Sequence, residues 1–380
     1  MKITFIGQKG IPALAGGVER HVEELAVRLA KIPNTEVVAY TRPWYSAKAV
    51  TSYDGVRLVS LPSVHTKNFD AITHTFLAII HAALIERADI IHIQAVGPAI
   101  LAPLARLLRP KAKVIVTFHC IDRQHQKWGR FAKLMLWLGE FMTMKFAHEV
   151  IAVSRTIQHY SYESYGRMVK YIPNGATLHA IVPADKITEQ FGLKSKDYVL
   201  TVARLVQHKG IHYLIKAFKK LETDKKLVIV GASTFTDDYV QEIITLAADD
   251  ARIIFTGLQT GPVLQELYSN AYCFALPSES EGLSIALLEA GSYGLPIVAS
   301  DIPANREVLD GNGLIVPVGN IEALRAALAQ LLSDKKLAEG FGEQANRMVL
   351  EHYQWDSIVA ETFECYTTGS ALTYQPAPIH

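Results

Sequence analysis

"CFALPSESEGLSIALLEAGSYGLPIVAS" (residues 273–300) is the stretch that decides the fold. Its first residues are apolar and predict a buried strand, and the polar turn after them leads into an apolar helical run that Gly291 or Gly294 ends. The run PIVAS (296–300) then predicts a second buried strand. Buried strands that are joined through a helix are typical of a parallel sheet covered by helices on both faces.

Short apolar runs alternate with helical patterns along the rest of the chain. The runs that predict strands are KITFIG, EVVAY, DIIHIQ, KVIVTF, EVIAVS and MVKYIP in the first half, and YVLTVARL, KLVIVG, RIIFTG, CFALPS and PIVAS in the second. A polar stretch at 176–197 separates the two series, and 380 residues suffice for two domains. We therefore predict an α/β fold of two Rossmann-like domains, residues 1–180 and 190–354.

Cysteine usage and hydropathy exclude several classes of protein. Cys120, Cys273 and Cys365 are far apart and form no CxxC pair, which argues against a disulfide framework or a zinc site and favours a reducing compartment. No apolar run approaches the ~18 residues of a transmembrane helix, and the start MKITFIGQKG lacks the apolar centre of a signal peptide. We expect a cytoplasmic protein.

Basic residues are concentrated in the first half of the chain. Residues 1–190 contain 23 lysines and arginines against 14 acidic residues, whereas the remainder contains 15 against 23. The excess peaks between Arg106 and Lys145, beside Trp, Phe, Leu and Met. Two interpretations stay open: a solvated helix face, or peripheral attachment to an anionic surface such as the inner face of the cell membrane. Nucleic acid is not an expected partner, because no recognition motif is present.

In the first half, residues with binding chemistry come directly after the strands, where open α/β sheets bind ligands. In GQKGIPALAGGVERHV (7–22), Gly16 and Gly17 stand directly before a helix, so the backbone can approach a ligand closely. The glycine spacing fits neither the GxGxxG motif nor the GxxxxGK[ST] phosphate loop. His119 comes after the strand run KVIVTF, and the residues alone leave a core histidine and a binding histidine equally open.

In the second half, the candidates are two cations and two carboxylates. Arg204 and Lys209 come after a strand and favour a pyrophosphate clamp. Glu281 stands just before the predicted helix and Glu289 two turns inside it, roughly 12 Å further along a helix axis. Between them lie the free helix N–H groups of Leu283, Ser284 and Ile285.

This span matches a nucleotide-sugar, with the diphosphate over the helix N-terminus and each carboxylate accepting hydrogen bonds from sugar or ribose hydroxyls. The alternative is that Glu281 is an ordinary acid at a helix start and Glu289 a paired helix residue. The five aliphatic residues between them argue against it, because they force the helix into the core.

Together these motifs resemble the retaining, GT-B-fold glycosyltransferases of family 4. ARLVQHKG (203–210) resembles the R-L-x-x-x-K-G segment of that family and PSESEGLSIALLEA (277–290) its E-x7-E signature, while IPNGA (172–176) and DIPANREVL (301–309) stand where its loops lie. The resemblance covers nearly the whole chain. It implies two domains that face a central cleft, with a C-terminal helix at about 355–370 packed back on the first domain.

The first half is similar to a bacterial subgroup of the family, rhamnosyl- or similar transferases of polysaccharide assembly. GQKGIPALAGGVERHVEEL resembles its GTRGIPAxYGGFE start, and TFHCIDRQHQKWG its HGLDxQRxKWG segment. Cys120 and Val18 depart from the pattern, where glycine and an aromatic residue are usual, and they leave the sugar and the acceptor open.

The resemblance implies retaining transfer of a hexosyl or deoxyhexosyl unit from a UDP-, GDP- or dTDP-sugar to a saccharide acceptor, lipid-linked in our reading. It assigns catalysis to Glu281, His119, Arg204 and Lys209, and donor binding to Gly16, Gly17, Arg204, Lys209, Leu258, Gly282, Leu283, Ser284 and Glu289. In this assignment Glu289 holds the ribose, Glu281 and His119 the sugar, Gly17 the diphosphate and Leu258 the base.

We expect no metal and no cofactor. The chain has no DxD motif, since Asp237-Asp238 and Asp249-Asp250 are adjacent pairs, so protein cations would stabilise the departing diphosphate. Two other functions stay open: a non-catalytic nucleotide-sugar-binding subunit of a polysaccharide assembly complex, and a nucleotide-sugar 2-epimerase of similar fold. The intact set of clamp residues argues against the subunit, and donor incubated without acceptor distinguishes the epimerase.

Overall fold

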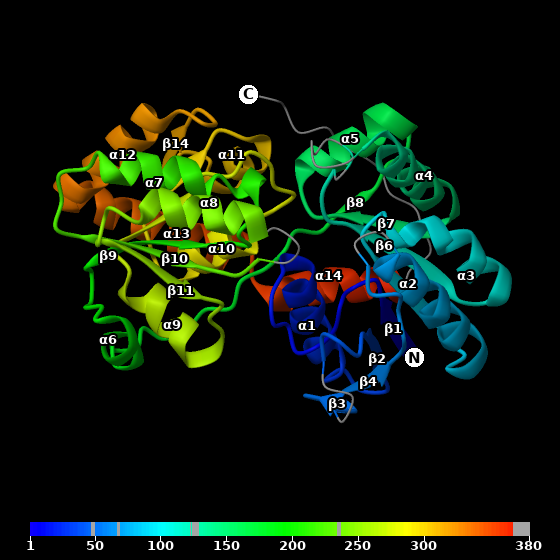
Figure 1. Ribbon diagram of the computed structural model, residues 1–380. Coiled ribbons are helices and arrows are strands. Elements are labelled where there is room, and N and C mark those ends of the chain that lie inside the picture. Colours follow the sequence, from blue (N-terminus) through cyan, green and yellow to red (C-terminus); the bar gives the residue numbers. More distant parts are fainter. Residues whose placement is uncertain (47–49, 67–68, 122, 124–128, 234–236, 368–380) are drawn as a thin grey trace. The chain divides into compact units, whose positions relative to one another are not determined.

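The computed structural model describes residues 1–380 except 47–49, 67–68, 122, 124–128, 234–236 and 368–380 (Figure 1). The chain forms two compact units, and each is a predominantly parallel sheet covered by helices. Unit 1 comprises Met1–Asn174 and Trp355–His380, and unit 2 comprises Gly175–Gln354. Our sequence prediction placed the change of domain at 180–190, whereas the division falls directly after Asn174.

Unit 1 contains a sheet with the strand order β3-β4-β2-β1-β5-β6-β7-β8. Its strands are β1 (Lys2–Ile6), β2 (Glu36–Thr41), β3 (Ser52–Tyr53), β4 (Val56–Ser60), β5 (Ile90–Gln94), β6 (Lys113–Phe118), β7 (Glu149–Ala152) and β8 (Lys170–Tyr171). Its α-helices are α1 (Gly17–Leu29), α2 (Asp70–Ile80), α3 (Ala102–Leu108), α4 (Arg130–Phe146), α5 (Arg155–Tyr165) and α14 (Trp355–Thr367). Shorter helical turns cover His81–Ile85 and Pro98–Leu101.

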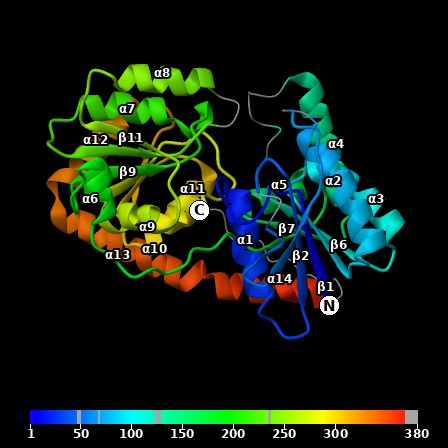
Figure 2. The ribbon, with the colours of Figure 1, turned by 60° about the horizontal axis from the view of Figure 1, so that its bottom comes forward.

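Helices α1 and α14 cover one face of this sheet, and α2, α3 and α4 lie on the other (Figures 1 and 2). The apolar stripe of α1, Val22, Leu25 and Leu29, packs in one buried cluster with Ile3 of β1 and Trp355 of α14. A stripe with this spacing lies on one side of a helix, so α1 packs that side against the sheet. The last helix thus completes the core of the first unit.

All six strands predicted in this half are present, but the β3–β4 hairpin was missed. Asp54 and Gly55 form its turn with φ angles of 42° and 85°. A two-residue Asp-Gly turn with positive φ at both positions favours an antiparallel hairpin, so the signal was in the sequence. The strands on either side are short and carry polar residues, which hides them among surface loops.

Unit 2 contains a fully parallel sheet with the strand order β11-β10-β9-β12-β13-β14. Its strands are β9 (Tyr198–Val202), β10 (Lys226–Val230), β11 (Ile253–Gly257), β12 (Cys273–Leu276), β13 (Ile297–Ser300) and β14 (Leu314–Val316). Its α-helices are α6 (Lys186–Phe191), α7 (Ile211–Lys219), α8 (Asp237–Ala247), α9 (Gly261–Asn270), α10 (Ile285–Ser292), α11 (Pro303–Leu309), α12 (Ile321–Ser333) and α13 (Lys335–His352). The sequence predicted all of these strands except the three-residue edge strand β14.

The central strands β9 and β12 bring the candidate residues of unit 2 to one edge of its sheet. They pair in parallel, Val199 opposite Cys273, so the segments after them leave the sheet at the same edge. Gly210 has a φ of 67°, and a side chain there would collide with the carbonyl oxygen of Pro277. The two loops therefore touch at a position that only glycine fits.

None of the helices in the described ranges has the length and apolar character needed to cross a bilayer.

Candidate functional site

The loops after β9 and β12 place Lys209 against Glu281. The ammonium nitrogen lies 2.5 Å and 2.6 Å from the two carboxylate oxygens, and the side chains are 15% and 8% exposed. Ser278 donates to Glu281 Oε1 at 2.7 Å. Because a lysine ammonium has three N–H groups and Glu281 accepts at two positions, Lys209 retains one donor for a further anion.

Arg204 lies on the same loop and is exposed. Among the residues that the structure describes, its guanidinium has neither a hydrogen-bond nor an ion-pair partner. The two cations of the predicted clamp therefore differ, because Lys209 is already paired with Glu281 and Arg204 is paired with no described residue. Arg204 has the fork of donors that suits a phosphate group.

Helix α10 begins at Ile285, three residues later than the sequence predicted. Ser284 is its N-cap, with an extended backbone and an Oγ that accepts from Leu287 N at 3.3 Å. The helix therefore presents the first-turn amides from Ile285 onward, and Leu283 precedes it. Glu289 is the fifth residue, one turn inside rather than two. Glu281 stands before the helix, as predicted, but because the helix starts only at Ile285 the helical rise does not apply to all eight residues between the two glutamates.

Glu289 is held by a buried tyrosine. The Tyr268 hydroxyl on α9 donates to Glu289 Oε2 at 3.1 Å, and the Tyr268 ring stacks on Tyr293 with ring centroids 5.3 Å apart and an interplanar angle of 6°. The His179 ring also stacks on Tyr293, with centroids 5.5 Å apart. The stack fixes the phenol, and the phenol orients the carboxylate.

The remaining predicted residues of unit 2 lie on loops near this sheet. Leu258 comes directly after β11 and is 44% exposed. Gly282 and Leu283 are buried between Glu281 and α10. Among the described residues, no group of three or more His, Cys, Asp or Glu side chains is placed to hold a metal ion.

In unit 1, side chains hold the glycine-containing loop that precedes α1. Gly16 has a φ of 109°, which only glycine adopts readily, and Gly17 is the first residue of the helix. Four loop amides donate to side chains: Lys9 N to Glu19 at 3.2 Å, Ala13 N to Glu23, and Leu14 N and Ala15 N to the Tyr45 hydroxyl at 2.6 Å and 3.0 Å. These hydrogen bonds hold the loop in one conformation, and Gly16 and Gly17 stand at its end, directly at the start of α1.

His119 comes directly after β6 and belongs to a buried cluster of polar side chains. Its Nε2 lies 2.8 Å from Oε1 of Gln94, the last residue of β5. The His21 ring of α1 packs against it edge-on, with centroids 4.9 Å apart, and His21 Nδ1 lies 2.9 Å from Asn174 Oδ1. Burial lowers the pKa of His119 well below its usual value and the pKa of His21 to about 4. Both imidazoles are therefore neutral at physiological pH.

The structure thus gathers the predicted residues in two sets, one in each unit, and adds residues that we missed. Gln94, His21, Tyr268 and Ser278 position the predicted ones, and we assigned none of them a role, although His21 and Ser278 stand inside the quoted motifs. Gln94 had a signal nevertheless, since a polar residue that ends a buried parallel strand lies at the ligand-binding edge. Of the predicted HCIDRQHQKWG segment, Asp122 and residues 124–128 lie outside the described residues.

Two known families match the chain in succession. Residues 15–179 match the family described as Glycosyltransferase Family 4, and residues 184–348 match the family described as Glycosyl transferases group 1. The chain carries two glycosyltransferase domains. The family 4 resemblance is confirmed at this level, and the rhamnosyltransferase-like subgroup stays a prediction.

Individual relatives agree with this assignment. An uncharacterised glycosyltransferase of Methanocaldococcus jannaschii is 33% identical over 172 residues, a match that spans 44% of each protein. A GDP-mannose-dependent alpha-(1-6)-phosphatidylinositol monomannoside mannosyltransferase of Mycolicibacterium smegmatis is 25% identical over 379 residues, 90% of this glycosyltransferase and 93% of that enzyme. The crystal structure of Anabaena HepE in complex with UDP-glucose superposes with a TM-score of 0.81 at 21% identity, covering 96% and 100% of the two chains. The predicted GT-B-type α/β fold is confirmed.

Proposed function

We propose that this glycosyltransferase moves a hexosyl or deoxyhexosyl unit, with retention at the anomeric carbon, from a nucleotide-sugar to a lipid-linked saccharide in cell-surface polysaccharide biosynthesis. The observation that carries the proposal is the grouping at one edge of the unit 2 sheet. Arg204, the Lys209–Glu281 pair and the capped start of α10 occur together there. The mycobacterial mannosyltransferase relative and the UDP-glucose complex of HepE support a nucleotide-sugar donor.

Cleavage of the glycosidic bond leaves a nucleoside diphosphate with additional negative charge. Arg204 supplies a guanidinium that no described residue pairs with. Lys209 supplies one further N–H group, and the α10 amides supply the positive end of a helix dipole. Glu289, oriented by Tyr268, is suited to accept hydrogen bonds from ribose hydroxyls. Glu281 would accept from the donor sugar, and Lys209 links this contact to the phosphate.

These groups would make a divalent metal unnecessary. Transfer should therefore continue at full rate in excess EDTA after extensive dialysis. Loss of activity in EDTA that magnesium or manganese restores would overturn metal independence, while leaving the assignment as a glycosyltransferase intact.

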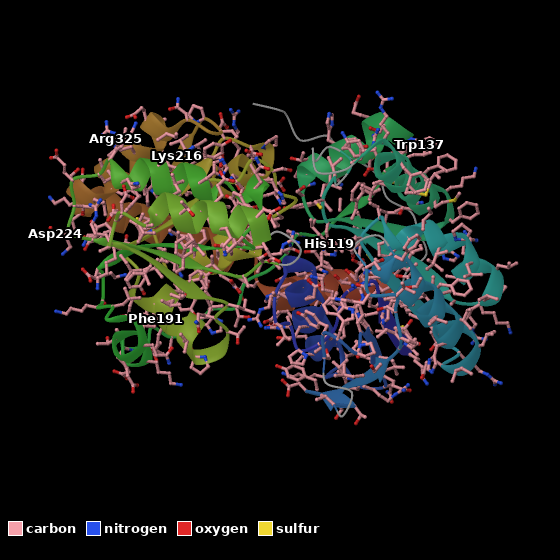
Figure 3. All side chains as sticks on the ribbon, viewed as in Figure 1. His119, Trp137, Phe191, Lys216, Asp224 and Arg325 are labelled. Atoms are coloured by element: carbon pink, nitrogen blue, oxygen red, sulfur yellow. The ribbon has the colours of Figure 1, made fainter. Side chains whose placement is uncertain are left out.

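The proposal of retention rests on the family resemblance, and that of a lipid-linked acceptor on the surface of unit 1. Four large apolar side chains of α4 are well exposed: Phe131, Leu134, Trp137 and Phe141, at 75%, 49%, 40% and 41%. Trp137 points away from the body of unit 1 (Figure 3), and the exposed Arg130 and Lys145 flank the helix. An apolar face bordered by cations suits an anionic bilayer surface.

The first experiment is a thermal-shift panel of UDP-, GDP- and dTDP-sugars, because a ligand that binds the native state raises the melting temperature. The stabilising donor is then incubated with and without lipid-linked saccharide, and the product is analysed by NMR. We expect nucleotide release and a product of unchanged anomeric configuration only with acceptor. Conversion of donor alone would indicate an epimerase, and binding without conversion would indicate a non-catalytic subunit.

Membrane contact has a separate test, co-sedimentation with anionic and with neutral vesicles at low and high salt. We expect binding to anionic vesicles that salt weakens. Equal recovery in the supernatant under all conditions would remove the membrane from the proposal.

A further inference from the structure

Gln94 is fully buried at the carboxyl end of β5, beside the end of β6 after which His119 stands. Its Oε1 lies 2.8 Å from His119 Nε2, whereas its Nε2 has no partner among the described residues. The backbone of Gly7 packs closely on this strand end, because a side chain on Gly7 would come within 2.5 Å of the carbonyl oxygen of Gln94. A buried amide that leaves its own donor unused is costly, so its contact with His119 calls for a functional explanation.

We propose that Gln94 is a positioning residue that holds His119 as the neutral tautomer protonated at Nε2, so that Nδ1 can only accept a hydrogen bond. The group that His119 would recognise is then a hydroxyl of a sugar bound by this glycosyltransferase. The role of His119 toward a sugar rests on the proposed function, but its tautomer and its fixed orientation do not.

The position of the proton on His119 follows from the chemistry of the Gln94 amide oxygen. Gln94 Oε1 accepts hydrogen bonds and cannot donate, so the imidazole nitrogen facing it must carry a proton. In a neutral ring the other nitrogen then has a lone pair. A sugar hydroxyl can donate to that lone pair, whereas a phosphate oxygen cannot.

The surroundings of His119 oppose a second proton. The titratable groups that act on it are His21 of α1 and His92 of β5, and both disfavour an additional positive charge. His21 is itself fixed by Asn174, and its buried Nε2 has no partner among the described residues. His92 lies between the Tyr366 hydroxyl of α14 and the Thr117 hydroxyl of β6, at 2.8 Å and 2.7 Å. Burial lowers the pKa of His21 to about 4 and that of His92 to about 3, so both groups that act on His119 are neutral at physiological pH.

The direct test is a long-range ¹H–¹⁵N correlation spectrum of the full-length protein labelled at histidine nitrogen, recorded between about pH 5.5 and pH 8.5. We expect the His119 signals of a neutral ring protonated at Nε2, unchanged over this range. A ring protonated at Nδ1, or one that titrates within the range, would overturn the proposal. This readout does not require catalysis, so it stands even if no transfer activity is found.

The second test is Gln94→Glu. Gln158→Glu on α5, which removes the bond from the Gln158 amide to the carbonyl oxygen of Val169 at 2.9 Å, controls for a new carboxylate and a lost hydrogen bond in the same unit. A carboxylate at position 94 favours the imidazolium, so the variant should titrate at His119 and should transfer sugar only above the new pKa. We expect turnover roughly 100-fold below wild type at pH 6 and partial recovery by pH 8, with the donor KM little changed. The control should keep the wild-type pH profile.

A uniform loss of Gln94→Glu activity at every pH, with a His119 spectrum identical to wild type, would contradict the positioning role. If the variant does not fold, as judged by circular dichroism, the wild-type spectrum alone decides. Inactivity of the wild type together with the expected spectrum would refute the proposed function and leave the tautomer assignment standing.

Discussion

The candidate residues of the two units differ in their electrostatics. In unit 2, Lys209 and Glu281 form an ion pair, and Ser278 donates a further hydrogen bond to Glu281. In unit 1, His21 and His119 are kept neutral, because burial without a counter-ion disfavours protonation. Under the proposed function this contrast would supply charge to the departing diphosphate in unit 2 and withhold it from the sugar hydroxyl groups in unit 1.

The most severe test of this contrast removes the negative charge of Glu281 from the ion pair in unit 2. Glu281→Gln keeps the shape but leaves Lys209 half-buried without its counter-ion, which costs about 3–5 kcal/mol for buried pairs. We expect turnover to fall roughly 1,000-fold or more and the melting temperature to drop. Steady-state kinetics and differential scanning calorimetry measure both effects.

The matched control is Glu279→Gln, two residues away on the same loop, where the exposed carboxylate accepts from Tyr213 at 2.8 Å. It should retain turnover within about threefold of wild type. Near-normal turnover of Glu281→Gln, or equal losses of turnover in both variants, would contradict the assignment of Glu281 to the donor sugar.

Mild acid should destabilise unit 1 more than unit 2. Burial lowers the pKa of His21 to about 4 and that of His92 to about 3, whereas an unfolded histidine titrates near 6.5. The unfolded state therefore binds more protons as pH falls below about 6.5, so stability present above that pH is lost. The loss should reach about 2 kcal/mol per histidine at pH 5.

Hydrogen exchange read by mass spectrometry at pH 7 and pH 5, corrected for the intrinsic rate, measures this separately for each unit. We expect the strands of unit 1 to lose protection relative to those of unit 2. Replacement of His92 by Gln should make the stability of unit 1 depend less on pH. Equal losses in the two units would contradict the contrast between them.

Because Lys209 is paired with Glu281 and Arg204 with no described residue, replacing each of them should affect stability differently. Arg204→Met and Lys209→Met should each lower turnover about 10- to 100-fold, since charge-assisted hydrogen bonds contribute about 1.5–3 kcal/mol. Only Lys209→Met should also lower the melting temperature, because it leaves Glu281 buried without a partner. The exposed Lys216 on α7, changed to Met, serves as the control (Figure 3).

Identical melting temperatures for the two clamp variants would show that the pair in the ligand-free protein contributes nothing to stability. Unchanged turnover in both would remove the clamp from the mechanism.

The residues that could be predicted from the sequence differ in kind from those that could not. Apolar runs fix the strands, and the loops that leave parallel strands begin at one edge of the sheet, so Arg204, Lys209 and Glu281 could be grouped without coordinates. The contact of Lys209 with Glu281 could not, because it depends on the pairing of β9 with β12 and on the path of two loops. The helix start was misplaced because Ser284 was counted as a helical residue rather than recognised as its cap.

Positioning residues are harder still, because their spacing in the sequence is large. Gln94 and His119 are 25 residues apart, and His21 and Asn174 are 153 apart. Neither pair repeats at a helical or strand period, so only the folded sheet brings them together. For this reason the positioning residues of unit 1 were the harder ones to predict.

The smallest effect that we expect comes from Tyr268, and it distinguishes the role of Glu289 from that of Glu281 within unit 2. Tyr268→Phe removes the hydroxyl that donates to Glu289 at 3.1 Å and keeps the ring stacked on Tyr293. A net hydrogen bond of about 0.5–1.5 kcal/mol should raise the donor KM roughly 2- to 12-fold, and turnover should stay close to wild type because Glu289 is assigned to the ribose and not to the reacting carbon.

Tyr272→Phe is the matched control, since its hydroxyl donates to the carbonyl oxygen of Leu331 at 3.0 Å in the same unit. Both variants lose one phenolic hydrogen bond and should lose similar stability, but only Tyr268→Phe should change the donor KM. A change in turnover without a change in KM would move Glu289 from the ribose to the chemical step. Glu281 and Glu289 would then share a role that we have divided between them.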